Sequence, residues 1–279
     1  MVRILADSST LYSPVQAQAA GFDVTPLSVT IGSESWRELA EISSEDFLAK
    51  VEAGGLPTSS QPAVGDVAAL YEKYAGEPVL HITMADGLSG TYQAARAAAE
   101  MVESDPPVQV LNSRTLCGPH RFLVENAVRL ARQGLSRPAI VRRTEELMQT
   151  EKSFLIPSDF AYLRRGGRLS PLVSYVGQAV RLAPLLTLTA DATRLTVSAV
   201  KRSYLHAVEA VIHSFAAHGV GENWCITITH AGAAQAAEKA RWLLQKAFPA
   251  ARLEVLPLSP VFIAQGGPGC VAIQTIRMV

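Results

Sequence analysis

Three short segments hold the side chains of this sequence that could do chemistry. They run from Thr58 to Gln61, from Gly87 to Thr91 and from Gln265 to Gly269. Together they supply hydroxyl groups, side-chain amides and backbone N–H groups, all of which can donate hydrogen bonds to an anion. None of the three contains a histidine or a carboxylate that would serve as a base. Donors without a base indicate binding of an anion rather than its turnover.

The segment from Gly87 to Thr91 has the sequence context of an anion site. The apolar run from Val79 to Thr83 is typical of a buried strand, and Tyr92 to Glu100 favours a helix. The first N–H groups of a helix have no partner within it and lie at the positive end of its dipole. A turn of Ser89, Gly90 and Thr91 at that position is therefore predicted to hold a phosphate or a carboxylate. The alternative is structural, with Ser89 or Thr91 only capping the helix.

Two other functions stay open at the same turn. A serine-dependent acyl hydrolase would use Ser89 as its nucleophile, although Gly90 comes one position too early for the G-x-S-x-G pattern. A binding module for another anionic small molecule would use the same donors. No zinc-protease, P-loop or dinucleotide-binding motif is found, so neither a metal nor a cofactor is predicted.

Composition excludes several classes of protein. The chain has 279 residues, 48% of them apolar, and its 25 basic and 25 acidic residues give a net charge of zero, which argues against nucleic-acid binding. No apolar window is long enough to span a membrane, and no signal peptide is visible. The three cysteines are far apart in the sequence, as expected for reduced thiols, and predict a cytoplasmic protein.

Strand and helix patterns alternate through the first 150 residues, which predicts a parallel, doubly wound sheet. The run from Val24 to Ile31 is expected to form one of its strands. The Gly- and Pro-rich surroundings of Thr58 to Gln61 predict a loop, and Gln265 to Gly269 predict a tight loop.

The pattern changes after residue 150. The runs Pro184 to Thr189 and Thr193 to Val200 flank Asp191-Ala192 and predict a β-hairpin, hence a mixed sheet. Leu172 to Arg181 is predicted to be an apolar helix. We therefore expect an α/β protein with an N-terminal domain over 1–150 and a C-terminal domain over 151–279. The apolar stretches Val173 to Leu188 and Leu253 to Ala264 could line a pocket for an apolar tail.

Four blocks, in this order, resemble the signature segments of the DegV family. They are Thr58 to Pro62, Gly87 to Gln93, Tyr162 to Ser170 and Gly267 to Gly269. Members of that family are two-domain α/β proteins that bind one long-chain fatty acid in a tunnel near the domain junction. In many bacteria they are the acyl-carrying partner of a fatty-acid kinase, which converts the bound carboxylate to an acyl phosphate. The resemblance implies a lipid-binding protein rather than an enzyme, and it allows transient membrane contact.

The resemblance also assigns site residues. Ser59 matches a family threonine, Ser89 matches the carboxylate-binding serine, and Gln265 stands where the family has a histidine. The ligand-binding set implied in this way is Thr58, Ser59, Ser89, Gly90, Thr91, Gln265 and Gly266.

Two positions depart from the family pattern. Gln265 can donate an N–H but cannot be cationic or shuttle a proton, which weighs against phosphoryl transfer more than against lipid binding. Ala183 replaces a common lysine, so a cation near the tunnel mouth is expected to be missing.

Overall fold

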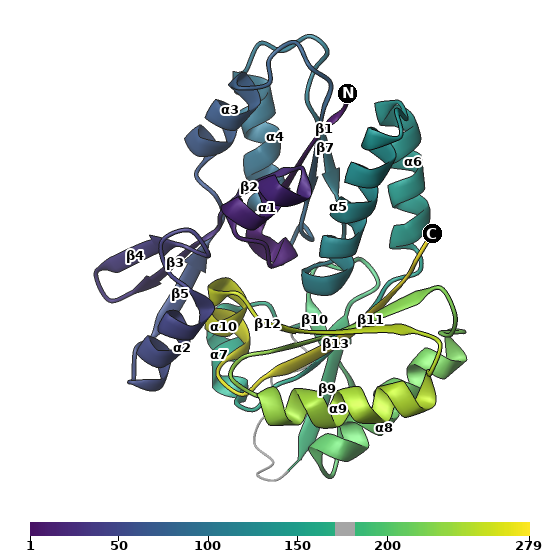
Figure 1. Ribbon diagram of the computed structural model, residues 1–279. Helices are drawn as coiled ribbons and strands as arrows, with labels where there is room; N and C mark the ends of the chain where they lie inside the picture. Colours follow the sequence, from purple (N-terminus) through teal and green to yellow (C-terminus); the bar gives the residue numbers. More distant parts are fainter. Residues whose placement is uncertain (171–181) are drawn as a thin grey trace.

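The computed structural model describes residues 1–170 and 182–279, so the helix predicted from Leu172 to Arg181 lies outside the described residues. The described chain forms a four-stranded, a six-stranded and a three-stranded sheet (Figure 1). The first is parallel and the second is mixed, which confirms the predicted α/β class. No helix in these two ranges has the length and apolarity needed to cross a bilayer.

The parallel sheet has the strand order β2-β1-β6-β7. Its strands are β1 (Arg3–Asp7), β2 (Asp23–Thr25), β6 (Val79–Thr83) and β7 (Gln109–Asn112). Helices α1 (Pro14–Ala20), α5 (Cys117–Arg132) and α6 (Arg137–Met148) share one apolar cluster with it, and α3 (Val64–Glu72) and α4 (Thr91–Met101) share another. Ile4 and Leu5 of β1 belong to different clusters, since successive strand residues point to opposite faces. Both faces of this sheet are therefore covered.

The three-stranded sheet corrects two predictions. It consists of β4 (Glu34–Arg37), β3 (Ser28–Ile31) and β5 (Pro57–Ser60), all antiparallel, with α2 (Ser44–Glu52) between β4 and β5 in the chain. The single strand predicted from Val24 to Ile31 is wrong, because the chain leaves the parallel sheet after Thr25 and enters this sheet at Ser28. Pro26, which has no N–H to donate, stands in the interruption. The loop predicted around Thr58 is also wrong, since β5 pairs with β3 as an edge strand.

The mixed sheet has the order β10-β9-β8-β13-β11-β12. Its strands are β8 (Lys152–Ile156), β9 (Ala183–Leu188), β10 (Leu195–Lys201), β11 (Trp224–His230), β12 (Arg252–Pro257) and β13 (Val271–Arg277). The predicted hairpin is confirmed, with β9 and β10 antiparallel and Asp191 Oδ1 accepting from Thr193 N at 3.1 Å. Helices α8 (Tyr204–Ala217) and α9 (Ala234–Ala247) cover the face directed away from the parallel sheet (Figure 1).

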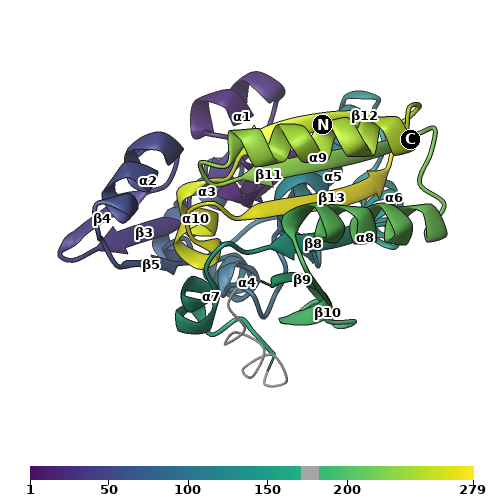
Figure 2. The ribbon, with the colours of Figure 1, turned by 90° about the horizontal axis from the view of Figure 1, so that it is seen from below.

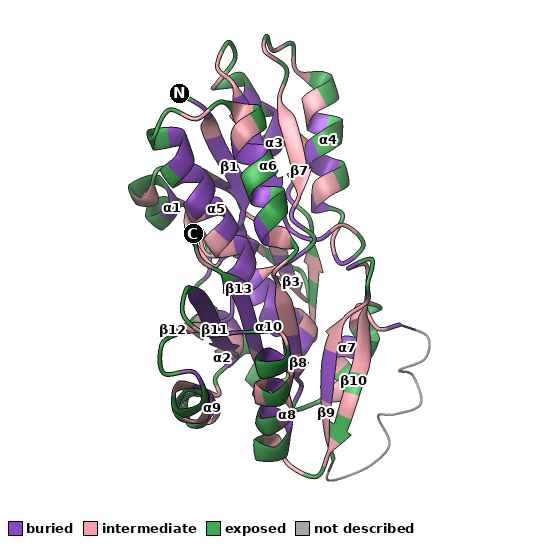
Figure 3. Ribbon diagram, turned by 90° about the vertical axis from the view of Figure 1, so that its right-hand side faces the viewer, coloured by how far each residue is buried: buried purple, intermediate pink, exposed green. Residues whose placement is uncertain are grey.

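Figure 3 shows that the strands of the two large sheets hold much of the buried chain, while the outer faces of α6 and α8 are exposed. Leu123 of α5 and Leu147 of α6 pack against Cys225 and Ile276 of the mixed sheet. These contacts join the two layers directly.

Two short helices lie where the three-stranded sheet meets the mixed sheet. They are α7 (Phe160–Gly166) and α10 (Pro260–Gly266), and they contact each other (Figures 1 and 2). Helix α10 also contacts α2, β3 and β5. The tight loop predicted from Gln265 is wrong in its first two residues, because Gln265 and Gly266 form the last turn of α10. Helix geometry therefore sets the direction of the Gln265 side chain.

Candidate functional site

A cavity with largely apolar walls lies where the segments around the two short helices meet. About 110 Å³ of it is open to the centre of a water molecule. Its apolar wall includes Leu27, Met84, Leu116, Leu155, Leu188 and Phe262. These side chains come from segments along almost the whole chain, from the loop before β3 to α10. The apolar lining suits a hydrocarbon chain.

Ser59 and Gln265 meet at the polar part of this cavity. Gln265 Nε2 donates to Ser59 Oγ at 2.8 Å, although the two residues are 206 positions apart. Gly266 and Ser89 line the same cavity. The structure thus brings together Ser59, Ser89, Gln265 and Gly266, from three sequence segments that composition alone singled out.

The other three predicted site residues do not line the cavity. Thr58 is exposed, whereas its chain neighbours Ser59, Ser60 and Gln61 line the cavity. Gly90 is the N-cap residue of α4. Thr91 is buried, and its Oγ1 lies 2.7 Å from Ser89 Oγ. This hydrogen bond fixes the orientation of the Ser89 hydroxyl.

Arg168 is a cavity residue that the sequence analysis missed. Its Nε donates to Leu88 O at 3.0 Å, and its Nη1 donates to Gly166 O. Burial lowers the pKa of its guanidinium. No carboxylate pairs with it in residues 1–170 and 182–279, and residues 171–181 contain no Asp or Glu. Arg168 thus brings a cation to the cavity, whereas the expectation from Ala183 concerned the tunnel mouth and stays a prediction.

The polar groups form one contiguous set. A Cβ added to Gly166 would lie 2.1 Å from Gln265 Oε1 and 3.9 Å from Arg168 Cδ, so both side chains flank this glycine. Arg168 also reaches Leu88, the neighbour of Ser89. A head group at this place would meet a cation, two hydroxyls and an amide.

Glu38 holds α10 in place. Its side chain is fully buried, its Oε2 accepts from Val261 N at 2.8 Å, and its Oε1 accepts from Ser8 Oγ at 2.5 Å. Burial raises its pKa to about 7. Nothing in the sequence near Glu38 pointed to this role, because its partners are 30 and 223 residues away.

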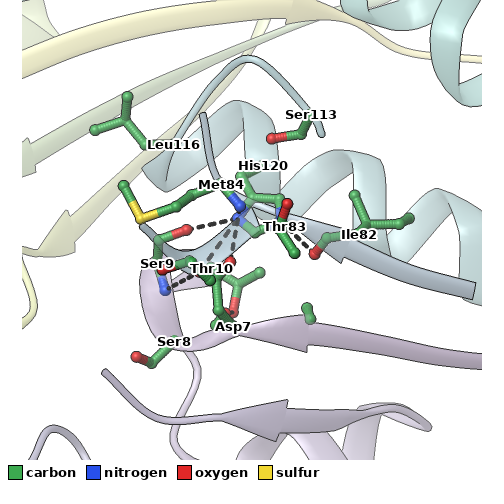
Figure 4. Close-up of polar contacts among 12 residues, drawn as sticks. Asp7, Ser8, Ser9, Thr10, Ile82, Thr83, Met84, Ser113, Leu116 and His120 are labelled. Carbon is green, nitrogen blue, oxygen red and sulfur yellow. Dashed lines mark hydrogen bonds and ion pairs between the residues drawn. The ribbon is translucent and has the colours of Figure 1, made fainter. Parts of the chain in front are cut away.

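A second buried network fixes the cavity wall at Met84 (Figure 4). Asp7 accepts from Met84 N at 2.7 Å and from Ser9 N at 2.9 Å. His120 Nε2 lies 3.0 Å from Ile82 O, which can only accept, so Nε2 carries the proton. His120 Nδ1 then accepts from Ser9 Oγ at 2.6 Å. Burial lowers the pKa of His120, which keeps the ring neutral.

This network does not serve as a catalytic triad. Asp7, Ser9 and His120 are each at most 1% exposed and do not line the cavity. Within the described part of the chain, no histidine hydrogen-bonds Ser89. The nucleophile–base contact that a serine hydrolase needs is therefore not formed there. The same residues contain no group of three or more histidine, cysteine or acidic side chains suited to a metal.

Comparisons with known proteins identify the family and the fold. The family model of the uncharacterised DegV proteins matches residues 1–278. A DegV domain-containing protein of Staphylococcus aureus, SA1258, is 27% identical over 277 residues, which cover 98% of each chain. The crystal structure of DegV from Bacillus subtilis, described as a fatty acid binding protein, superposes with a TM-score of 0.87 at 25% identity and covers 99% of each chain.

A DegV family protein from Thermus thermophilus, described by its fatty acid binding, gives a TM-score of 0.88 at 25% identity, again with 99% of each chain covered. Sequence blocks, fold and family match extend over the same residues. The chain belongs to the DegV family.

Proposed function

We propose that this protein binds one long-chain fatty acid, with its tail in the apolar cavity and its carboxyl group beside Ser59, Ser89, Gln265 and Arg168. The observation that carries this proposal is an apolar cavity lined by the guanidinium of Arg168, which no carboxylate of the described residues pairs with. The fatty acid binding of the Bacillus and Thermus relatives supports the same ligand class.

The energetics favour a ligand with a long tail. Each buried CH₂ group contributes about 0.8 kcal/mol, so the tail supplies most of the affinity. The acidic head group must be hydrogen-bonded or neutralised, because burying it bare is costly. A wide polar pocket would favour another anionic small molecule, but the walls here are mainly leucine, phenylalanine and other apolar residues.

Lipid extraction tests the proposal. Mass spectrometry of an organic extract of the purified protein should find an acid with 14 to 18 carbons, and the delipidated protein should rebind it. An extract without acyl chains, from protein that also fails to rebind them, would contradict the proposal.

Substitution of Ser89 tests the place of the head group. Ser89→Ala should weaken fatty-acid binding by about 1–3 kcal/mol, because one buried hydrogen bond to the ligand is lost. Ser198→Ala is the matched control, since Ser198 is exposed on β10 and does not line the cavity. Equal affinities of the two variants in a displacement titration would remove Ser89 from the site.

The proposal extends to a partner. We propose that the loaded protein presents its carboxyl group to a fatty-acid kinase, with transient membrane contact when the lipid is loaded. The test mixes loaded protein, ATP and such a kinase and traps acyl phosphate as a hydroxamate. Failure to form acyl phosphate, together with normal lipid binding, would refute the kinase role alone. Gln265→His should raise the yield if a proton carrier is the missing element.

A further inference from the structure

We infer that Leu188 sets the longest acyl chain that this site accepts, because its side chain stands between the lipid cavity and a second, polar hollow. The inference rests on the proposed function and specifies which members of its ligand class bind. Leu188 is the last residue of β9 and lines the lipid cavity.

Strand β13 gives the direction of the lipid cavity. Cys270, which directly precedes β13, and Ala272 and Gln274 within it all line the cavity. Residues two apart in a strand point to the same face, and each residue rises about 3.3 Å, so these three side chains follow one wall over about 13 Å. The cavity is therefore elongated along β13.

The proposed head-group residues lie at the Cys270 end of this wall. A Cβ added to Gly266, the neighbour of Gln265, would lie 2.7 Å from Cys270 Sγ. At the opposite end, Gln274 Nε2 donates to Ser153 Oγ at 2.6 Å. A tail that starts beside Gln265 and follows β13 therefore ends at Ser153.

A second hollow adjoins this far end. Its lining is polar and includes the charged and hydroxyl side chains of Arg114, Glu151, Lys152 and Thr189. Ser153, Thr187 and Leu188 line both the second hollow and the lipid cavity. These three residues, on the paired strands β8 and β9, form a wall between the two spaces (Figure 2).

Hydrogen bonds hold two of the three wall residues. Thr187 Oγ1 donates to Ser153 O at 2.8 Å. Ser153 Oγ accepts from Gln274 and donates to Glu151. Leu188 is the apolar residue of the wall and packs against the apolar cluster around α10. The end of the tail therefore meets the Leu188 side chain, and the size of that side chain decides where the tail must stop.

A tail that is longer than the apolar wall gains no further affinity. Each pair of CH₂ groups buried in the cavity raises the affinity about tenfold. Beyond the wall, further CH₂ groups would have to displace Leu188 from its packing or lie among charged side chains that stay hydrated. The affinity should therefore rise with chain length to one optimum and then stop rising.

The first experiment uses the delipidated wild-type chain. Saturated acids of 12 to 22 carbons are compared by displacement of a fluorescent fatty acid at one pH. We expect the affinity to rise about tenfold for every two carbons up to an optimum between 14 and 18 carbons. Acids longer than the optimum should bind no more tightly.

Two variants of Leu188 should move this optimum in opposite directions, which a general loss of folding cannot do. Leu188→Ala removes three carbon atoms from the wall, so the optimum should move to an acid at least two carbons longer. Leu188→Phe adds three carbon atoms and should move it to an acid at least two carbons shorter. Leu195→Ala is the matched control, because Leu195 lines the lipid cavity but not the second hollow. It should weaken the binding of every acid without moving the optimum.

The outcomes separate the inference from the proposed function. If the wild-type affinity keeps rising through 22 carbons, or if both Leu188 variants keep the wild-type optimum, the wall does not limit the tail and only the inference falls. If no acid of the series binds, the proposed function falls with it.

Discussion

Arg168 shows how one residue can change the character of an apolar cavity. Arg168→Gln keeps a hydrogen-bond donor but removes the charge, so the affinity for a fatty acid should fall about tenfold, the difference between a charge-assisted and a neutral hydrogen bond. A displacement titration measures it. Arg165→Gln is the control, because Arg165 is exposed and its guanidinium lies over the Tyr162 ring at 4.5 Å. An equal loss in both variants would show that Arg168 has no specific role.

Glu38 should make stability depend on pH. Its pKa is about 7 in the folded protein against 4.5 as the ordinary value, so the folded state binds more protons between these limits. Its contribution to stability is therefore lost as the pH rises from 4.5 through 7, by up to about 3 kcal/mol. Glu38→Gln should abolish this loss, because an amide oxygen still accepts from Val261 N without a buried charge. Urea unfolding at pH 5 and pH 8 measures the difference.

His81 changes the stability with pH in the opposite direction, so its contribution must be separated from that of Glu38. Burial lowers the pKa of His81 to about 4, so its contribution to stability is lost as the pH falls below 6.5. The difference between wild type and Glu38→Gln at each pH cancels this term. Glu100→Gln, in an exposed residue of α4, is the control. A pH profile shared by Glu38→Gln and wild type would contradict the prediction.

Sequence patterns could predict only part of the site at this scale. Ser59, Ser89 and Gln265 were found because each lies in a short stretch of hydrogen-bond donors, although the structure places Ser59 in β5 and Gln265 in α10. Glu38 contacts Ser8 and Val261, and Arg168 contacts Leu88, all distant in the chain, and nothing in their own neighbourhoods indicates those contacts. Their roles follow from how the sheets are placed, which local pattern does not determine.

At the scale of elements, β5 shows how tertiary pairing overrides local preference. Gly54, Gly55 and Pro57 predict a loop, yet pairing with β3 makes Pro57–Ser60 a strand. This assignment matters for function, because the pairing of β5 with β3 fixes the backbone of Ser59 and Ser60, which both line the cavity. The hairpin of β9 and β10 was predictable, since its turn is local.

The turn before α4 depends on Gly87, which gives an element-scale prediction. Gly87 has φ +91°, and an added Cβ would lie 2.7 Å from Thr193 Cβ and 2.9 Å from Thr193 Cα, in the β9–β10 turn. Gly87→Ala should therefore cost about 1–3 kcal/mol of folding free energy and displace Ser89, lowering fatty-acid affinity as well. Thermal unfolding and a binding titration measure the two effects.

Gly76→Ala separates backbone strain from the clash. Gly76 has a similar φ of +86°, but an added Cβ would meet nothing within 4 Å. Gly76→Ala should lower the stability only by the cost of the strained backbone, and it should bind fatty acid normally. If Gly87→Ala matched it in both measurements, the contact with Thr193 would be unimportant.

At the scale of the whole molecule, buried polar contacts join the first and second halves of the chain. Gln274 Nε2 donates to Leu116 O at 3.1 Å and to Ser153 Oγ at 2.6 Å, and its Oε1 accepts from Gly118 N at 3.2 Å. These contacts tie β13 to the start of α5 at the cavity wall. Separate domains over 1–150 and 151–279 remain a proposal.

Loss of the Gln274 hydrogen bonds should lower the stability of the whole protein. Gln274→Met leaves the N–H of Gly118 and the carbonyl of Leu116 without that partner, which should cost about 1–3 kcal/mol in the free energy of unfolding. Denaturant unfolding measures it, and Gln245→Met is the control, because Gln245 makes one surface hydrogen bond to Pro249 O. Equal stabilities would show that the halves are held together by apolar packing alone.

The α/β class and the two large sheets could be predicted, since they follow from local alternation of strands and helices. The third sheet and the position of α10 could not, because β3 pairs with β5 across α2 and α10 reaches back to β5 from the far end of the chain. The cavity forms where these long-range contacts meet. The sequence could therefore predict the hydrogen-bond donors of the cavity but not the residues that form its apolar walls.

The cavity walls come from both ends of the chain, and this has a consequence for the degradation of the protein in a cell. A vacant hollow of this kind is a packing defect, and filling it would stabilise the fold by about 2.7 kcal/mol when the lipid is at 100 times its dissociation constant. Proteases act on molecules that open, and openings become rarer as the fold gains stability. Under the proposed function, scarcity of acyl chains would shorten the survival of the protein, and its abundance would follow the supply of its ligand.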